Sequence, residues 1–218
     1  FQKSAAASIA KQNKKLALDT VTAIANEISP STQGRQIFLD FDKTLAIGAD
    51  KIGPKINKKS PDYAAFGDPK QISQGLGSAK LTNLGVRLRK LVANLDMKQA
   101  GLGRELLKRM FVVSARPQRT MPLIARWIRN QGIRIPPGNV GGVGGPGVSN
   151  IGLAKAEKMI GLGAGPGSVF IDDEGKNIEA ARNKGISSIR YGFKFDKSDP
   201  IARKQAATEE GYQFEKFI

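Results

Sequence analysis

Short apolar runs alternate with amphipathic segments along most of the chain. Four runs are apolar enough to form buried strands, and they cover residues 36–41, 110–114, 168–173 and 187–191. Between them, apolar residues recur at the three- and four-residue spacing of helices. The predicted helices cover residues 81–95, 102–109, 123–132, 151–163 and 175–185. This alternation predicts an α/β domain with a Rossmann-like parallel sheet and helices on both faces.

Two segments fall outside this alternation. Residues 3–28 contain no Gly or Pro and have apolar positions at near-helical spacing, which predicts an extra N-terminal helix. We therefore divide the chain into an N-terminal helix and linker, residues 1–34, and a main domain, residues 35–218. Residues 47–80 are rich in Gly, Pro and Lys, which predicts a loop-rich insertion or a minimal cap.

Two glycine-rich stretches stand out, GGVGGPG at 141–147 and GLGAGPG at 161–167. Neither contains the GxxxxGK[ST] pattern of a phosphate-binding loop, and the second precedes a predicted strand. We interpret both as flexible connections, the first beside a short possible strand within residues 138–150.

The residue types that are missing limit the chemistry. The chain has no cysteine and no histidine, which excludes thiolate chemistry and the commonest general base. No run approaches the roughly 18 apolar residues of a membrane span, and no secretory signal is apparent. We expect no membrane partner and a cytoplasmic or otherwise intracellular location. The first residue is Phe rather than Met, which is compatible with a trimmed chain, a processed product or a part of a larger polypeptide or assembly.

Positive charge is concentrated in one part of the chain. The formal net charge is +16, and residues 50–135 hold 18 Lys or Arg against 5 Asp or Glu. This surplus favours anionic partners such as nucleotides or nucleic acid. A solvated surface that serves only solubility is the alternative.

Carboxylates follow two of the apolar runs. Asp40 and Asp42 end the first, Asp172 and Asp173 end the third, and Ser114 ends the second. In a parallel sheet these residues lie along one edge, and residues two apart in an extended strand project to the same side. Neighbouring carboxylates repel unless a cation compensates, so a shared Mg²⁺ is the simplest solution. Beside it, one carboxylate could attack a phosphate and the other could transfer the proton.

Each of these polar residues also has a purely structural interpretation. Carboxylates and hydroxyls at strand ends often cap the following helix, which applies to Asp42, Thr44, Ser114 and Asp173. Lys155, on a predicted helix, could simply be a solvated lysine.

The combination of motifs resembles the haloacid dehalogenase (HAD) superfamily of phosphohydrolases. DFDKTL at 40–45 matches the DxDxT signature, and VVSAR and VFIDD follow in the order of that superfamily. The resemblance spans residues 36–192, and the short distance between the first two motifs implies a small cap and an open site.

The resemblance implies a role for each matching residue. Asp40 is the nucleophile, Asp42 the general acid and base, and Thr44 helps to orient them. The Ser114 hydroxyl binds the transferring phosphoryl group, and Lys155 offsets negative charge, with Lys158 in reserve. The implied Mg²⁺ ligands are Asp40, the backbone carbonyl of Asp42, Asp172 and Asp173.

The expected function is therefore that of a Mg²⁺-dependent phosphomonoesterase that acts through an aspartyl-phosphate. The basic section favours a nucleotide or a nucleic-acid terminal phosphate as the phosphorylated substrate. Expected substrate contacts are Ser114, Ala115, Arg116 and Arg119. The alternative is a non-catalytic HAD-like module of a larger assembly, such as a virion component, that binds nucleic acid through its basic face.

Overall fold

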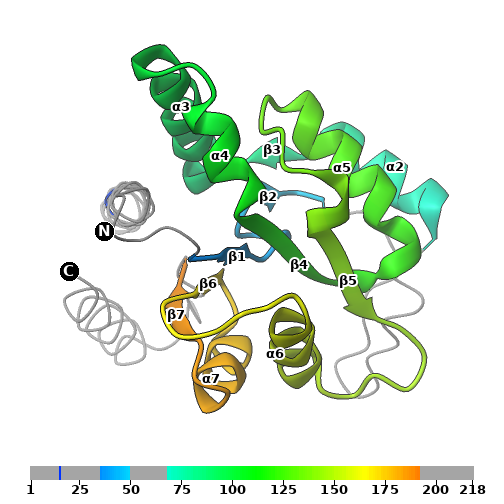
Figure 1. Cartoon of the computed structure of the whole chain (residues 1–218). Coiled ribbons are helices and arrows are strands. Elements are labelled where there is room, and N and C mark those ends of the chain that lie inside the picture. The colour runs from blue at the N-terminus through cyan, green and yellow to red at the C-terminus, as the bar shows by residue number, and fades with distance from the viewer. Residues whose placement is uncertain (1–14, 16–34, 50–67, 192–218) are drawn as a thin grey trace, which may run out of the picture.

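Five parallel strands form the central sheet of the computed structural model, which describes residue 15, residues 35–49 and residues 68–191 (Figure 1). The strands are β1 (Ile37–Leu39), β4 (Met110–Pro117), β5 (Val140–Gly144), β6 (Val169–Asp172) and β7 (Ser187–Arg190). Their order across the sheet is β5-β4-β1-β6-β7, and every neighbouring pair is parallel. The predicted α/β fold class is confirmed.

Helices cover both faces of this sheet (Figure 1). They are α2 (Pro69–Ser78), α3 (Asn83–Lys98), α4 (Leu102–Lys108), α5 (Met121–Asn130), α6 (Ile151–Gly161) and α7 (Gly175–Asn183), with short 3-10 turns η3 (Gln118–Thr120) and η4 (Pro137–Asn139). The helices α2 to α5 pack on one face, and α6 and α7 pack on the other.

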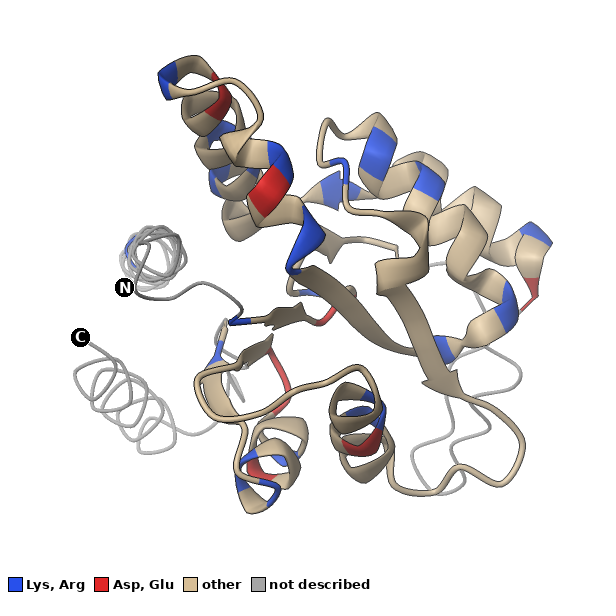
Figure 2. Ribbon diagram, in the orientation of Figure 1, with Lys and Arg blue, Asp and Glu red and all other residues tan. Residues whose placement is uncertain are grey.

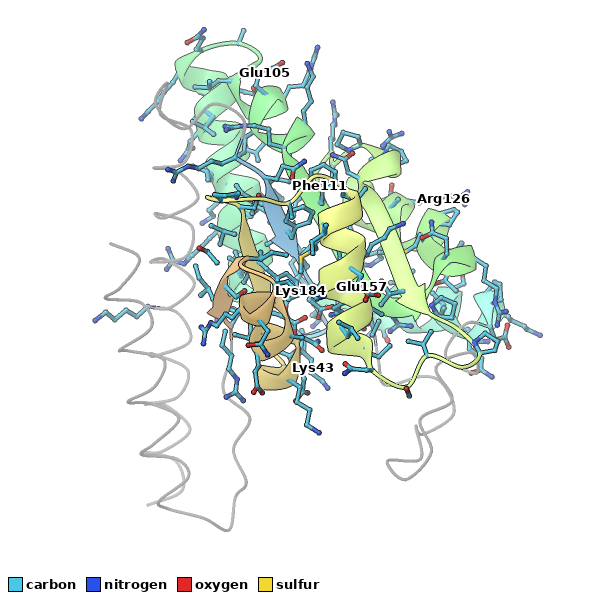
Figure 3. The ribbon with its side chains drawn as sticks, turned by 60° about the horizontal axis from the view of Figure 1, so that its bottom comes forward. Lys43, Glu105, Phe111, Arg126, Glu157 and Lys184 are labelled. Carbon is cyan, nitrogen blue, oxygen red and sulfur yellow. The ribbon has the colours of Figure 1, made fainter. Side chains whose placement is uncertain are left out.

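Alternate residues of each strand supply the two halves of the core. Leu39 and Val112 belong to the cluster on the α2–α5 side, whereas Phe38 and Val113 belong to the cluster with α6 and α7. Phe111 stacks on Phe38 with ring centroids 5.0 Å apart and lies on the α6 side of the sheet (Figure 3). Since both faces are buried, the strands are apolar throughout rather than alternating with polar residues.

The chain order reverses at β1. From β1 the chain passes to β4 and β5 on one side, and then returns to β6 and β7 on the other. In open parallel sheets this reversal leaves a crevice at the carboxyl ends of the central strands, where ligands bind. Acidic segments follow both β1 and β6 at this point (Figure 2).

The structure differs from two expectations for non-regular segments. Residues 140–144 form β5, which confirms the short possible strand within residues 138–150 but makes most of the first glycine-rich stretch a strand and not a flexible connection. Within the predicted loop at 47–80, residues 69–78 form α2, which begins at the capping carboxylate of Asp68. This segment contains two glycines and few apolar residues, and only Ile72, Gly75 and Leu76 are buried. Its sequence therefore shows no helical pattern of apolar positions.

Other features of the insertion are short. β2 (Ala46–Ile47) and β3 (Lys80–Leu81) form an antiparallel pair beside the sheet. The predicted N-terminal helix and residues 50–67 lie outside the described residues, apart from helical Lys15. None of the described helices has the length and apolar character needed to cross a bilayer.

Candidate active site

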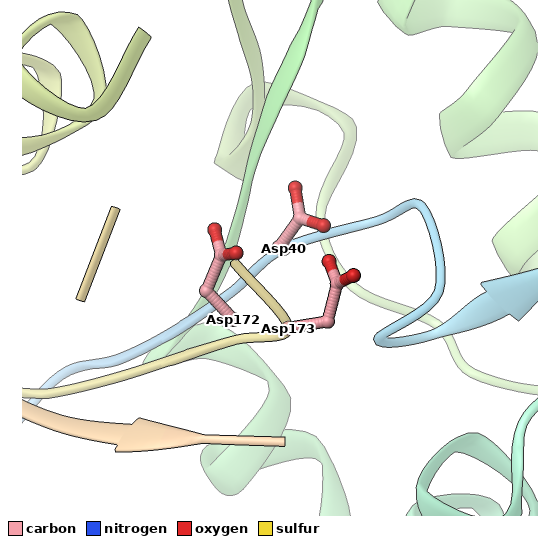
Figure 4. A group of neighbouring side chains, drawn as sticks. All are labelled: Asp40, Asp172 and Asp173. Atoms are coloured by element: carbon pink, nitrogen blue, oxygen red, sulfur yellow. The ribbon is translucent and has the colours of Figure 1, made fainter. Parts of the chain in front are cut away.

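Two neighbouring strands end in carboxylates at the same edge of the sheet. Asp40 directly follows β1, and Asp172 is the last residue of β6. The two strands pair with Leu39 opposite Ile171, and the Asp40 N–H donates to the Ile171 carbonyl at 2.8 Å. This register sets Asp40 beside Asp172, and Asp173 completes the group. One oxygen from each of the three carboxylates lies within 4.8 Å of the others (Figure 4).

A buried lysine joins two of these carboxylates. The Lys155 side chain comes from α6 and is 1% exposed. Its Nζ donates to Asp40 Oδ1 at 2.5 Å and to Asp172 Oδ2 at 2.7 Å. Lys158, the other lysine considered from the sequence, is exposed on the same helix. Lys155 is therefore the lysine that reaches the carboxylates, and it is not a solvated side chain.

Burial and neighbouring charges shift the protonation of this group. Burial raises the pKa of Asp40 well above its usual value, the charges of Asp172 and Asp42 raise it further, and Lys155 opposes the shift. Burial alone would lower the pKa of Lys155, but the carboxylates of Asp172 and Asp40 raise it overall. The lysine is therefore charged, while burial acts against the ionised form of Asp40.

The residues present fit a hard divalent cation. With all three carboxylates ionised, these groups and the Lys155 ammonium would carry a formal charge of −2 in a buried place. The available donors are carboxylate oxygens, which Mg²⁺ prefers, and a cation there would favour the ionised form of Asp40. Asp40, Asp172 and Asp173 are the residues that would hold it.

Further donors fix the orientation of Asp172. Its Oδ1 accepts the Glu174 N–H at 2.7 Å, and its Oδ2 accepts from Asn177 Nδ2 at 2.9 Å. Asn177 is a buried residue of α7 that was not predicted from the sequence. In the sequence, Asn177 could be recognised only as an Asn in the first turn of a predicted helix, five residues after the acidic end of a strand.

The chain turns immediately after Asp40. The N–H groups of Leu45 and Ala46 both donate to the Phe41 carbonyl, and Lys43 has a φ of 66°. Lys43 extends away from the body of the domain (Figure 3). Asp42 is therefore not an alternate residue of an extended strand, as was expected, and its carboxylate is not in the three-carboxylate group. The predicted contribution of its backbone carbonyl to metal binding stays a prediction.

The Asp42 carboxylate pairs with Arg116. The guanidinium donates from Nε to Asp42 Oδ2 at 2.8 Å and from Nη2 to Oδ1 at 2.7 Å. Arg116 is 2% exposed, and its Nη2 also donates to the Ala49 carbonyl at 2.9 Å. The guanidinium therefore binds Asp42 in this structure, and the expected contact of Arg116 with a substrate phosphate stays a prediction.

The other predicted site residues lie at or near the same edge. Ser114 is fully buried in β4, and its Oγ accepts the Arg116 N–H at 3.2 Å. Thr44 is fully buried, and its Oγ1 has no hydrogen-bond partner among the described residues. Ala115 is half-buried in β4, and Arg119 is exposed in η3, directly after that strand.

The helix-capping interpretation does not describe these residues. Thr44 and Asp42 precede the strand β2 and not a helix, and Ser114 lies inside β4. Glu174 takes the N-cap position of α7 without a side-chain capping bond, so Asp173 does not take that position. None of the four residues considered as caps therefore stands at the N-cap of a described helix.

Comparisons with known proteins found similarity only at the level of solved structures. No family model and no curated protein matches the chain. A haloacid dehalogenase-like family hydrolase, SP0104 from Streptococcus pneumoniae, is 16% identical with a TM-score of 0.43 over 72% of this chain and 86% of the other. Protein Tyrosine Kinase A from Mycobacterium tuberculosis is 15% identical with a TM-score of 0.42 over 80% and 99%. Similarity this distant carries no argument about activity.

Proposed function

We propose that this chain is a cation-dependent phosphomonoesterase of the HAD type, which forms an aspartyl-phosphate on Asp40. The observation that carries the proposal is the convergence of Asp40, Asp172 and Asp173 at the carboxyl ends of β1 and β6, with Lys155 bonded to the first two. Four ionisable groups are buried together where ligands bind in this type of sheet. Burial of charged groups costs free energy of folding, so a buried cluster of this kind is expected where it serves a function.

The proposed first step is attack on phosphorus by a carboxylate oxygen of Asp40. Since Lys155 donates to Oδ1, Oδ2 is the oxygen that remains to form the bond. The bond from phosphorus to the leaving oxygen breaks, and that oxygen takes a proton from the carboxyl group of Asp42. The Ser114 hydroxyl and the Lys155 ammonium balance charge on the transferring group.

The second step releases the phosphate. Asp42, now ionised, accepts a proton from water, whose oxygen attacks phosphorus and frees the Asp40 carboxylate. Bound Mg²⁺ would supply charge neutralisation and orientation of a phosphate oxygen. Asp40, Asp172 and Asp173 would hold it.

The proposed substrate is a nucleotide or a nucleic-acid terminal phosphate. No Asp or Glu occurs between residues 106 and 156, and this stretch includes α5. Arg126, Arg129 and Arg134 are exposed there, and none forms an ion pair within the described part of the chain. The α5 helix accordingly carries only basic charge (Figure 2). An unneutralised basic surface attracts a polyanion.

One observation favours the alternative of a non-catalytic nucleic-acid-binding module of a larger assembly. Lys155 already bonds to both Asp40 and Asp172, and Arg116 already bonds to both oxygens of Asp42. Carboxylates that are paired with side chains of the same chain are also compatible with a structural role.

Phosphate release and phosphoenzyme trapping separate the two functions. The purified chain is assayed with Mg²⁺ and with chelator on p-nitrophenyl phosphate, nucleotides and oligonucleotides phosphorylated at either end. We expect Mg²⁺-dependent release, an acid-stable and base-labile phosphoenzyme, and a loss of at least about 10³-fold in Asp40→Asn. The matched control is Glu157→Gln on the exposed side of α6, which should retain wild-type rates (Figure 3). Nucleic-acid binding without phosphate release from any substrate would instead establish the module.

A further inference from the structure

Arg116 is an unusual residue to bury. Its guanidinium remains charged at every physiological pH, and a buried charge is costly unless it is paired and hydrogen-bonded. Arg116 meets this condition with three hydrogen bonds, two to Asp42 and one to the Ala49 carbonyl. The fork geometry fixes both oxygens of the Asp42 carboxylate in one plane.

A bulge at the end of β4 delivers Arg116 to this position. The pairing of β4 with β5 shifts register between Ser114 and Pro117. At the same point the Arg116 N–H donates to Ser114 Oγ, a local bond that stabilises the bend. Bulges of this kind redirect a side chain at the end of a strand, often beside a functional site.

The glycine-rich stretch makes this bulge possible. A Cβ on Gly142 would lie 2.3 Å from the Arg116 carbonyl oxygen, and a Cβ on Gly144 would lie 2.1 Å from the Ala115 carbonyl oxygen. Only glycine allows β5 to approach the bulged backbone this closely. The motif that looked like a flexible connection is thus part of the support of Arg116.

Asp42 needs such support because its own backbone does not lie in a strand. It belongs to the turn after β1, where the next residue, Lys43, has a left-handed φ of 66°. Its carboxylate is 20% exposed and meets the buried guanidinium on one side. The Arg116 guanidinium bonds to both oxygens of this carboxylate and thereby fixes its orientation.

We propose that Arg116 is a positioning residue for Asp42. Arg116 thereby affects the proton transfers that the Asp42 carboxylate carries out. The inference rests on the proposed phosphatase function. Arg116 does not touch the substrate. It holds the Asp42 carboxylate where a proton passes to the leaving oxygen and, in the second step, from water to Asp42.

This role predicts a dependence on the leaving group. A p-nitrophenolate leaves without a proton, so its transfer to Asp40 needs Asp42 little, whereas an alkoxide must be protonated. Loss of Arg116 should therefore slow alkyl phosphates and phosphoenzyme hydrolysis, but not the burst of p-nitrophenolate. A merely structural role would slow all of these rates together.

The experiment compares Arg116→Gln and Arg116→Lys with the exposed control Lys184→Gln (Figure 3). We expect about 10²-fold or more loss of kcat on an alkyl phosphate and less than 10-fold change in the p-nitrophenolate burst rate. In the Asp42→Asn background, Arg116→Gln should add little further loss, because it acts through Asp42. Equal losses on both substrates, or full additivity with Asp42→Asn, would overturn the inference.

Two readouts separate this inference from the proposed function. If the wild type releases no phosphate from any substrate, the phosphatase proposal fails, and the inference fails with it. If the wild type is active, only the Arg116 variants bear on the inference. Arg116→Ala, if it folds, should regain part of its alkyl-phosphatase rate with added guanidinium but not with added ammonium. Equal rates with the two cations would count against the inference. Arg116→Lys keeps the charge and loses the fork, so it covers the case in which smaller substitutions do not fold.

Discussion

Replacing Lys155 with Met removes the cation that separates Asp40 from Asp172 while it keeps a side chain of similar length. Lys155 Nζ lies 2.5 Å from Asp40 Oδ1 and 2.7 Å from Asp172 Oδ2, and the lysine side chain is 1% exposed. The formal charge of the buried group, which also includes Asp173, would change from −2 to −3. The substitution therefore removes one partner from a buried ion pair and leaves the other partner uncompensated.

The expected loss of unfolding free energy follows from this burial. Breaking a buried pair on one side costs about 3–5 kcal/mol. Protonation of Asp40, whose pKa is already raised, limits the loss to that range. In a chain of this size the loss corresponds to a decrease in Tm of roughly 10 °C. Because whole domains are stable by only about 5–15 kcal/mol, the effect should be easily measured.

The measurement is urea unfolding in chelator and in Mg²⁺, followed by the fluorescence of the single, buried Trp127. In chelator, Lys155→Met should be less stable than the wild type by the amount given above. A divalent cation at the carboxylates should return a large part of the loss, about 2.7 kcal/mol at a concentration 100 times Kd. Lys158→Met is the matched control, since Lys158 is exposed on the same helix.

Two results would refute this reasoning. If Lys155→Met and Lys158→Met were equally stable in chelator, the buried ion pair would not exist in solution. If Mg²⁺ stabilised neither Lys155→Met nor the wild type against urea, the three carboxylates would not form a cation site.

Two further predictions concern the stability of the fold. Burial raises the pKa of Tyr191, whose hydroxyl oxygen accepts the Leu84 N–H at 3.2 Å, so the tyrosine favours its neutral form in the folded state. The contribution of the tyrosine hydroxyl to the free energy of unfolding is complete below pH 10 and is lost at higher pH. Tyr191→Phe should therefore lower the free energy of unfolding by about 1 kcal/mol at pH 8 and by progressively less above pH 10. A difference in urea unfolding that stays constant with pH would contradict this. Gly144→Ala should cost about 2 kcal/mol or more, because the new Cβ would lie 2.1 Å from the Ala115 carbonyl oxygen. Gly145→Ala, where nothing lies within 4 Å, is its control in thermal unfolding, and equal Tm values would exclude the close approach.

The strands and most helices could be predicted from the sequence because their signals are local. The apolar run that ends at Asp40 and the run that ends at Asp172 could each be recognised alone as a buried strand. Parallel pairing then brings their carboxyl ends to one edge, which is why this part of the candidate site could be expected before any coordinates.

The exceptions are segments whose structure depends on a distant partner. The α2 helix has weak helical propensity and packs against α5, where Trp127 Nε1 donates to the Leu76 carbonyl at 3.0 Å. The glycines of β5 indicate a loop when taken alone, yet they form a strand because β4 bulges against them. A pattern of apolar positions covers only neighbouring residues of the sequence, so it contains no information about either distant partner.

The sequence by itself determined which carboxylates lie at the edge of the sheet that carries the candidate site, because the position of each strand follows from local hydrophobicity. Only the tertiary structure decided how these residues pair: Lys155 with Asp40 and Asp172, and Arg116 with Asp42. The turn after Asp40 separates two carboxylates that an extended chain would have aligned. Charged side chains are long and their energies depend on burial and on every neighbouring charge, so their partners are set by the assembled core.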